Sequence, residues 1–173
     1  TVEIQVAKAM GGRVITTASS SNHEFVRSLG ADEVIDHTSD EYVSAVADLT
    51  HGQGVNVVFD TIGGDTLTRS PLALADAGRV VSIVDIAEPQ NLIEAWGKNA
   101  AYHFVFTRQN RGKLDALTNL VERGLIKPVI GAVPPLARIG EAHELHEGGS
   151  SRCPRVTVAL DVVGQPVALP RPD

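Results

Sequence analysis

The sequence predicts an α/β fold in which a doubly wound parallel sheet carries helices on both faces. Apolar runs of four to six residues alternate with longer amphipathic stretches over residues 1–125, a pattern typical of parallel strands covered by helices. The apolar run 55–60 ends in an acid, and in open α/β sheets ligands bind at the carboxyl ends of such strands. The opening segment 1–15 is typical of a helix that runs directly into a buried strand.

The predicted order of elements lacks two pieces that come first in a Rossmann-type sheet. In such a sheet a first strand and a glycine-rich loop precede the first helix, whose N-terminus holds the pyrophosphate of a dinucleotide. Neither precedes the helix predicted at the start of this sequence. We therefore expect the chain to be part of a longer polypeptide. The absent strand belongs in the centre of the sheet, between the strands predicted at 13–17 and 55–60.

Each remaining element has a local reason in the sequence. The strand 13–17 is rich in β-branched residues. Asn22 is a suitable N-cap for a helix that ends at Gly30, and Ser39 or Asp40 is a suitable N-cap for the next helix. The later predicted strands are 33–36, 55–60, 79–83, 101–106 and 155–163, and the later helices are 40–49, 67–74, 91–97, 113–123 and 140–147.

Residues after Gly124 have a different character. The segment 127–135 contains three prolines and predicts an extended segment at a sheet edge, because proline cannot donate to an interior ladder. The tail 165–173 contains three further prolines, and we expect it to be poorly ordered unless it docks on another part of the protein.

Composition and charge exclude several classes of function. A net charge of −6 and scattered basic residues argue against a nucleic-acid surface. No apolar run approaches the roughly 18 residues that a membrane span needs. The single cysteine, Cys153, excludes an internal disulfide and a multi-cysteine zinc site. We therefore expect a cytoplasmic enzyme, or part of one, that binds no metal, no nucleic acid and no membrane.

Several stretches are similar, in order and spacing, to one known family. The most specific are 29–36 and 58–64, and they are accompanied by 5–11, 14–19, 78–81, 126–128 and 142–143. Over about residues 1–160 the sequence resembles the nucleotide-binding half of a medium-chain dehydrogenase/reductase, in the zinc-free quinone oxidoreductase-like branch. The resemblance implies a nucleotide-binding domain at 1–125, incomplete at its N-terminus. It also implies C-terminal segments at 126–163 that return to an absent catalytic domain, followed by a tail at 164–173.

The resemblance also assigns residues to a nicotinamide cofactor. The expected cofactor-binding residues are Ser19, Ser20, Asn22, Thr61, Gly63, Ser82, Ile83, Phe104, Val105, Phe106 and Arg155. In the fold of this family, a carboxylate at the end of the second strand selects NAD. In this sequence the corresponding residues, 18–22, carry hydroxyl and amide groups and no carboxylate, which favours NADP. Gly63 would let the backbone approach the cofactor ribose, or would only relieve strain in a turn. Arg155 is equally compatible with a solvated charge at a strand edge.

We expect no catalytic residue within these 173 residues. His143 and His146 are three apart, whereas a zinc-protease helix needs a spacing of four. The Tyr-x-x-x-Lys pair of short-chain dehydrogenases is absent, since neither Tyr42 nor Tyr102 is followed by that lysine. The Gly-x-Ser-x-Gly pattern of hydrolases is absent too. In the quinone oxidoreductase-like branch the cofactor carries the hydride and the protein positions it.

The sequence thus predicts the cofactor-binding part of an NADP(H)-dependent oxidoreductase that transfers a hydride to a quinone or an α,β-unsaturated carbonyl. The chain by itself is expected to be inactive. Two alternatives stay open: a fragment of a zinc-type alcohol dehydrogenase, and a non-catalytic module that binds a nucleotide or dimerises. The resemblance also implies a homodimer joined through the strand 101–106.

Overall fold

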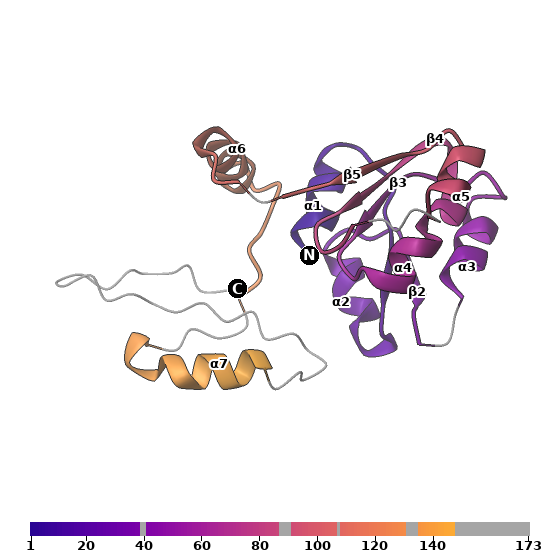
Figure 1. The fold of residues 1–173 in the computed structure, drawn as a ribbon. Coiled ribbons are helices and arrows are strands. Elements are labelled where there is room, and N and C mark those ends of the chain that lie inside the picture. The colour runs from indigo at the N-terminus through magenta and orange to yellow at the C-terminus, as the bar shows by residue number, and fades with distance from the viewer. Residues whose placement is uncertain (39–40, 87–90, 107, 131–134, 148–173) are drawn as a thin grey trace.

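The computed structural model describes residues 1–38, 41–86, 91–106, 108–130 and 135–147 (Figure 1). The strands are β1 (Ile15–Ala18), β2 (Glu33–Asp36), β3 (Val55–Asp60), β4 (Leu74–Ser82) and β5 (Ala101–Phe104). The helices are α1 (Val2–Ala9), α2 (His23–Ser28), α3 (Tyr42–Leu49), α4 (Gly64–Arg69), α5 (Asn91–Gly97), α6 (Arg111–Glu122) and α7 (Ile139–Glu147), with short 3-10 turns at Ser20–Asn22, Ser70–Ala73 and Leu136–Arg138. The strand predicted at 155–163 and the tail lie outside the described residues.

All strand pairs are parallel, as the sequence predicts, but they form two sheets. β1 pairs with β2, while β3, β4 and β5 form a second sheet in that order. Ile15 of β1 and Val55 of β3 pack against one shared cluster of buried side chains, so the two sheets are joined through the core although their strands are not paired. No strand among the described residues lies between β1 and β3, which is where the sequence places the missing first strand.

Three small apolar clusters hold the helices on the strands. The buried side chains are Ile4, Val26 and Ala31 in the first cluster, Ile35, Val46 and Ala73 in the second, and Leu67, Leu74 and Val80 in the third. On β3, by contrast, Val57 and Phe59 are 50% and 43% exposed. Exposed large apolar side chains on a strand next to an open sheet edge indicate a face that another element normally covers.

The structure corrects several predicted boundaries. The helix predicted at 67–74 ends at Arg69, because Pro71 lies in the 3-10 turn that follows. β4 accordingly begins at Leu74, earlier than the predicted start at 79, with an irregular register against β3 near its start. The strand predicted at 101–106 ends at Phe104. Of the extended segment predicted at 127–135, residues 127–130 form no strand, Pro135 is a single bridge residue, and 131–134 lie outside the described residues.

Of the two predicted helix caps, one is right in position and the other was wrong. Asn22 is the N-cap residue of α2, but its side chain makes no capping hydrogen bond and donates to Ser19 Oγ at 3.0 Å. α3 is capped by Glu41, whose carboxylate accepts from the backbone N–H groups of Val43 and Ser44. A carboxylate at this position also interacts favourably with the helix dipole.

Residues 126 and 127, which follow α6, dock on the rest of the chain, and Lys127 is hydrogen-bonded to α1. The side chain of Gln5, which is buried, donates to the Lys127 carbonyl oxygen at 3.1 Å and accepts from the Lys127 N–H at 2.7 Å. The neighbouring Ile126 is 2% exposed. In contrast, α6 buries none of its residues and lies apart from the sheets (Figure 1).

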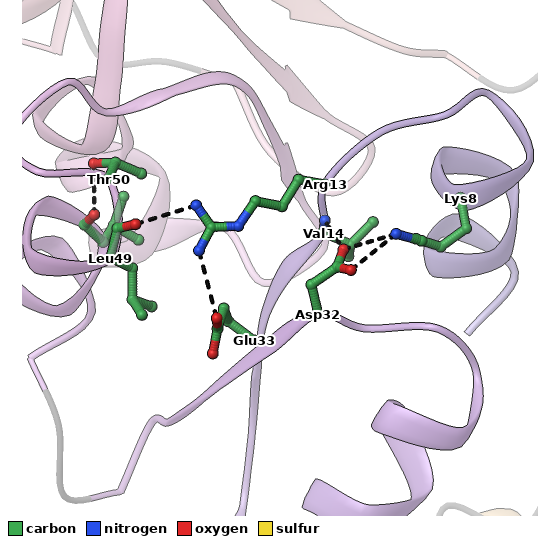
Figure 2. A network of polar contacts seen from close by, with 8 residues as sticks. Lys8, Arg13, Val14, Asp32, Glu33, Leu49 and Thr50 are labelled. Carbon is green, nitrogen blue, oxygen red and sulfur yellow. Dashed lines mark hydrogen bonds and ion pairs between the residues drawn. The ribbon is translucent and has the colours of Figure 1, made fainter.

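Asp32 and Glu33, in the segment 29–36, take part in a network of hydrogen bonds and ion pairs at the start of the first sheet (Figure 2). The Asp32 carboxylate accepts from the Val14 N–H at 2.7 Å and from Lys8 Nζ at 2.9 Å. Arg13 donates to the Leu49 carbonyl oxygen and to Glu33. Asp32 thus fastens α1 and the residues before β1 to the residues before β2. In this chain the most family-specific stretch has a structural role.

The backbone N–H of Val14, and next the hydrogen bond from Lys8, lower the pKa of Asp32 below its ordinary value of 3.8. A carboxylate with a lowered pKa in the folded state stabilises the protein above the pKa of the unfolded chain. This contribution is lost as the pH falls through the folded-state pKa.

We therefore expect Asp32→Asn to lower the free energy of unfolding at neutral pH and to flatten its dependence on pH below about pH 4. Urea unfolding at several pH values measures both. Asp48→Asn, which removes one exposed carboxylate from α3, is the control and should change the profile little. Equal pH profiles for the two variants would contradict the role given to Asp32.

Candidate functional site

The candidate site lies at the carboxyl ends of β3, β4 and β5. The strands are parallel and in register, so that Asp60 pairs with Ser82 and Ser82 with Phe104. Ligands of open α/β sheets bind outside this edge. The structure therefore brings together residues predicted for the nicotinamide side, which are Thr61, Gly63, Ser82, Ile83, Phe104 and Val105.

Asp60 organises the turn after β3. Its side chain is buried, with 3% of the residue exposed. Oδ1 accepts from the backbone N–H groups of Ile62 at 3.1 Å and Gly63 at 3.0 Å, and Oδ2 accepts from Ser82 Oγ at 2.8 Å. A buried carboxylate is tolerated when its oxygens are hydrogen-bonded in this way. Asp60 therefore fixes the turn from 61 to 64 and binds it to β4.

Ser82 extends the same network to the turn after β4. The residue is 1% exposed. While its hydroxyl donates to Asp60, its oxygen accepts long hydrogen bonds from the N–H groups of Val84 at 3.4 Å and Asp85 at 3.3 Å. One hydroxyl thus uses its donor and its acceptor capacity to join the two turns.

Asp85, in the turn after β4, forms a second hydrogen-bonded connection to the turn after β3. Its Oδ2 accepts from the Gly64 N–H at 3.0 Å, and this hydrogen bond, followed by that from the Ile86 N–H, lowers the pKa of Asp85. Gly63 has a φ of +78°, and a Cβ there would lie 3.0 Å from Asp85 Cβ. Glycine is therefore required at 63 both by the backbone conformation and by the close approach of Asp85.

The outer surface of the two turns and of β5 is apolar. The exposed apolar side chains there are Ile62, Ile83, Val84, Ile86, Phe104, Val105 and Phe106. Apolar side chains beside a few fixed polar groups are the usual lining of a cofactor site. Nothing lies within 4 Å of the place a Cβ would take at Gly64, so a ligand can approach the backbone there, whereas at Gly63 the Asp85 side chain fills that space. These features fit the aromatic nicotinamide ring and its ribose.

β5 contributes a stacked aromatic pair to this edge. The rings of Tyr102 and Phe104 are parallel within 16° and their centroids are 5.7 Å apart. Burial raises the pKa of Tyr102 to about 12, and its hydroxyl donates to the Leu67 carbonyl oxygen at 3.3 Å. The Val105 N–H donates to the Ser82 carbonyl oxygen at 2.9 Å and continues the ladder past the end of the strand.

A second group of predicted residues lies at the carboxyl end of β1, in the other sheet. Ser19 and Ser21 are joined through their hydroxyl oxygens at 3.2 Å, and Asn22 donates to Ser19 Oγ. Ser20 is exposed. The turn from 18 to 22 therefore presents hydroxyl and amide groups and contains no acid.

Sequence reasoning left three acids out of the expected site. Asp60 indicated that ligands bind at that strand end but was not named among the site residues. Asp85 gave no motif signal, and Asp36 lies in the register position opposite Ala18. The Asp36 carboxylate accepts from the hydroxyl and the N–H of Thr38, which lower its pKa. An acid at the carboxyl end of a predicted parallel strand, as at 36 and at 60, is a signal that was available.

Arg155 lies outside the described residues. In the part of the chain that the structure describes, no group of three or more His, Cys, Asp or Glu side chains is arranged to hold a metal ion. No helix there has the length and apolar character needed to span a bilayer.

Comparisons with known proteins indicate the family of the chain. A family model described as zinc-binding dehydrogenase matches residues 29–153. A 2-haloacrylate reductase from Burkholderia is 28% identical over 158 residues, which cover 82% of this chain and 46% of that protein.

Solved structures agree with the family match. The quinone oxidoreductase from Coxiella burnetii superposes with a TM-score of 0.76 at 30% identity, over 92% of this chain and 48% of that one. An NAD-dependent alcohol dehydrogenase superposes with a TM-score of 0.78 at 29% identity, over 91% and 46%. The chain spans about half the length of the relatives it matches. It belongs to the zinc-binding dehydrogenase family, with the Rossmann-type nucleotide-binding fold of medium-chain dehydrogenase/reductases.

Proposed function

We propose that the chain is the cofactor-binding part of an NAD(P)H-dependent oxidoreductase that reduces a quinone or an α,β-unsaturated carbonyl. The observation that carries the proposal is the pair of cross-linked turns after β3 and β4, beside an exposed apolar surface. The names of the relatives, a 2-haloacrylate reductase and a quinone oxidoreductase, support this reaction class.

In this proposal the bound reduced nicotinamide supplies the hydride, and the chain binds and orients it. The turn from 61 to 64 offers its backbone at Gly64, where nothing lies within 4 Å of the place a Cβ would take. Ile83 and Phe104 exclude water from the ring, because both present apolar surface at the same sheet edge. Residues that bind the substrate or donate a proton to it belong to other parts of the protein.

We further propose that, in the whole protein, a strand from outside these residues lies between β1 and β3. The two unpaired strand edges and the exposed side chains of Val57 and Phe59 support this. Without that strand the central ladder is open and the chain alone is inactive. In the whole protein, residues 1–125 belong to the nucleotide-binding domain, residues 126–163 pack toward the catalytic domain, and residues 164–173 form a tail.

Two alternatives remain. A zinc-type alcohol dehydrogenase is favoured by the family description and by one similar structure. A module that binds the nucleotide without catalysis is the other. We propose metal-free chemistry in a cytoplasmic protein, because the one cysteine of this chain can form neither a cysteine-cluster zinc site nor an internal disulfide.

The direct test uses the intact protein expressed from its own gene. NADPH should quench Trp96, which is 83% exposed on α5, and should be consumed when a quinone or an enone is added, with no bound zinc in metal analysis. Binding without turnover would favour the non-catalytic module. Activity that disappears when bound zinc is removed would favour the alcohol dehydrogenase. If neither NADPH nor NADH binds, the proposal is wrong.

We propose NADPH as the preferred cofactor, because the turn after β1 itself presents hydroxyl and amide donors, and the neighbouring Asp36 carboxylate on β2 is already hydrogen-bonded to Thr38. Ser20→Asp should weaken NADPH binding about tenfold or more, a change equivalent to ~1.4 kcal/mol, and leave NADH binding unchanged or stronger. Ser44→Asp makes the same charge change at an exposed site on α3 and should alter neither affinity. Parallel losses for both cofactors in Ser20→Asp would contradict the proposal.

We also propose a homodimer joined through β5 and the residues up to 106. β5 is the outer strand of its sheet, and Phe106 is 85% exposed. Sedimentation should give a dimer at micromolar concentration. Phe106→Asp should shift it toward monomer, whereas Trp96→Asp, which changes a similarly exposed aromatic residue on α5, should not. A monomeric unaltered protein would count against this interface.

A further inference from the structure

We infer that Asp60 and Ser82 are positioning residues, which hold the turns after β3 and β4 in one fixed arrangement around the nicotinamide half of the cofactor. This inference rests on the proposed function. Neither side chain needs to touch the cofactor, because both are buried beneath the turns.

The bonding of the two side chains leaves them little freedom. Asp60 accepts two backbone N–H groups from one turn and the Ser82 hydroxyl from the neighbouring strand. Ser82 accepts two N–H groups from the other turn. Hydrogen bonds to a buried carboxylate are stronger than those between neutral groups. The carboxylate therefore acts as the common anchor for both turns.

The loss of the Ser82 hydroxyl would release three groups at once. Asp60 Oδ2 would lose its donor, and the N–H groups of Val84 and Asp85 would lose their acceptor. A buried polar group left without its partner drives local rearrangement. The remaining connection, from the Gly64 N–H to Asp85, is exposed and does not replace the buried one. The two turns would then move independently of each other.

Ser70 provides a matched control for burial. It is 0% exposed, and its hydroxyl donates to the Thr66 carbonyl oxygen at 2.8 Å. It lies before β4 begins, whereas Ser82 is the last residue of that strand. Ser70→Ala therefore removes one buried serine hydroxyl at the opposite end of β4 from the candidate site.

The experiment titrates the intact protein with NADPH and, separately, with 2′,5′-ADP, which carries the adenosine half only. Ser82→Ala should weaken NADPH binding by about tenfold and reduce the fluorescence enhancement of the bound reduced nicotinamide. It should leave the affinity for 2′,5′-ADP unchanged. Ser70→Ala should change neither affinity, although thermal unfolding should show both variants to be destabilised.

Asp60→Ala and Asp60→Asn test the anchor itself. The carboxamide introduced by Asp60→Asn would keep an oxygen for the N–H groups of Ile62 and Gly63, but its NH₂ group would face Ser82 Oγ, whose two acceptor sites are already used by Val84 and Asp85. The Asp60→Asn variant should therefore keep the turn after β3, lose the connection to Ser82, and recover only part of the NADPH affinity that Asp60→Ala loses. If Asp60→Ala does not fold, the comparison of Ser82→Ala with Ser70→Ala still decides the question.

The outcomes separate this inference from the proposed function. If the unaltered protein binds neither NADPH nor NADH, the proposed function fails. If it binds NADPH but Ser82→Ala and Ser70→Ala behave alike, only the positioning role is refuted. Equal weakening of NADPH and 2′,5′-ADP by Ser82→Ala would likewise overturn it, because that pattern indicates general loosening of the domain.

Discussion

The candidate site depends on one buried carboxylate at the end of a parallel strand. Parallel register places Asp60, Ser82 and Phe104 side by side. The hydrogen bonds of Asp60 join the ends of β3 and β4, and the Val105 N–H joins β5 to the Ser82 carbonyl oxygen. Burying a charge is costly unless its oxygens are paired. The same pairing that makes the carboxylate tolerable therefore also determines the shape of the surface above it.

The division of the strands into two sheets is the second organising feature. In the doubly wound order 3-2-1-4-5-6 the first strand is central, and β1 and β3 are the strands that would flank it. Their inner edges are unpaired within the described residues, while Ile15 and Val55 still share one apolar cluster. The helices and the core thus preserve the arrangement of a doubly wound sheet around an open central position.

Sequence periodicity predicted the parallel strands and most helices, because burial on both faces makes each strand a short apolar run. It missed the features that depend on contacts between distant residues. Pro71 ends α4 where apolar spacing suggested a longer helix, and Glu41 caps α3 in place of Ser39 or Asp40. The role of Asp85 was invisible, since its partner Gly64 is 21 positions away in the chain. The stretch 29–36 was recognised as specific to the family, but the sequence did not show its structural role, which is the hydrogen bonding of Asp32 to Val14 and Lys8 (Figure 2).

The proposed function requires that a reduced dinucleotide lies along the carboxyl ends of β3, β4 and β5. A crystal structure of the intact protein with NADPH would show where the cofactor binds. We expect the nicotinamide and its ribose against the turns at 61–64 and 82–85, with Asp60 still bonded to Ser82 beneath them and a strand between β1 and β3. A cofactor seated elsewhere, or side chains of the protein filling that crevice, would contradict the proposed function.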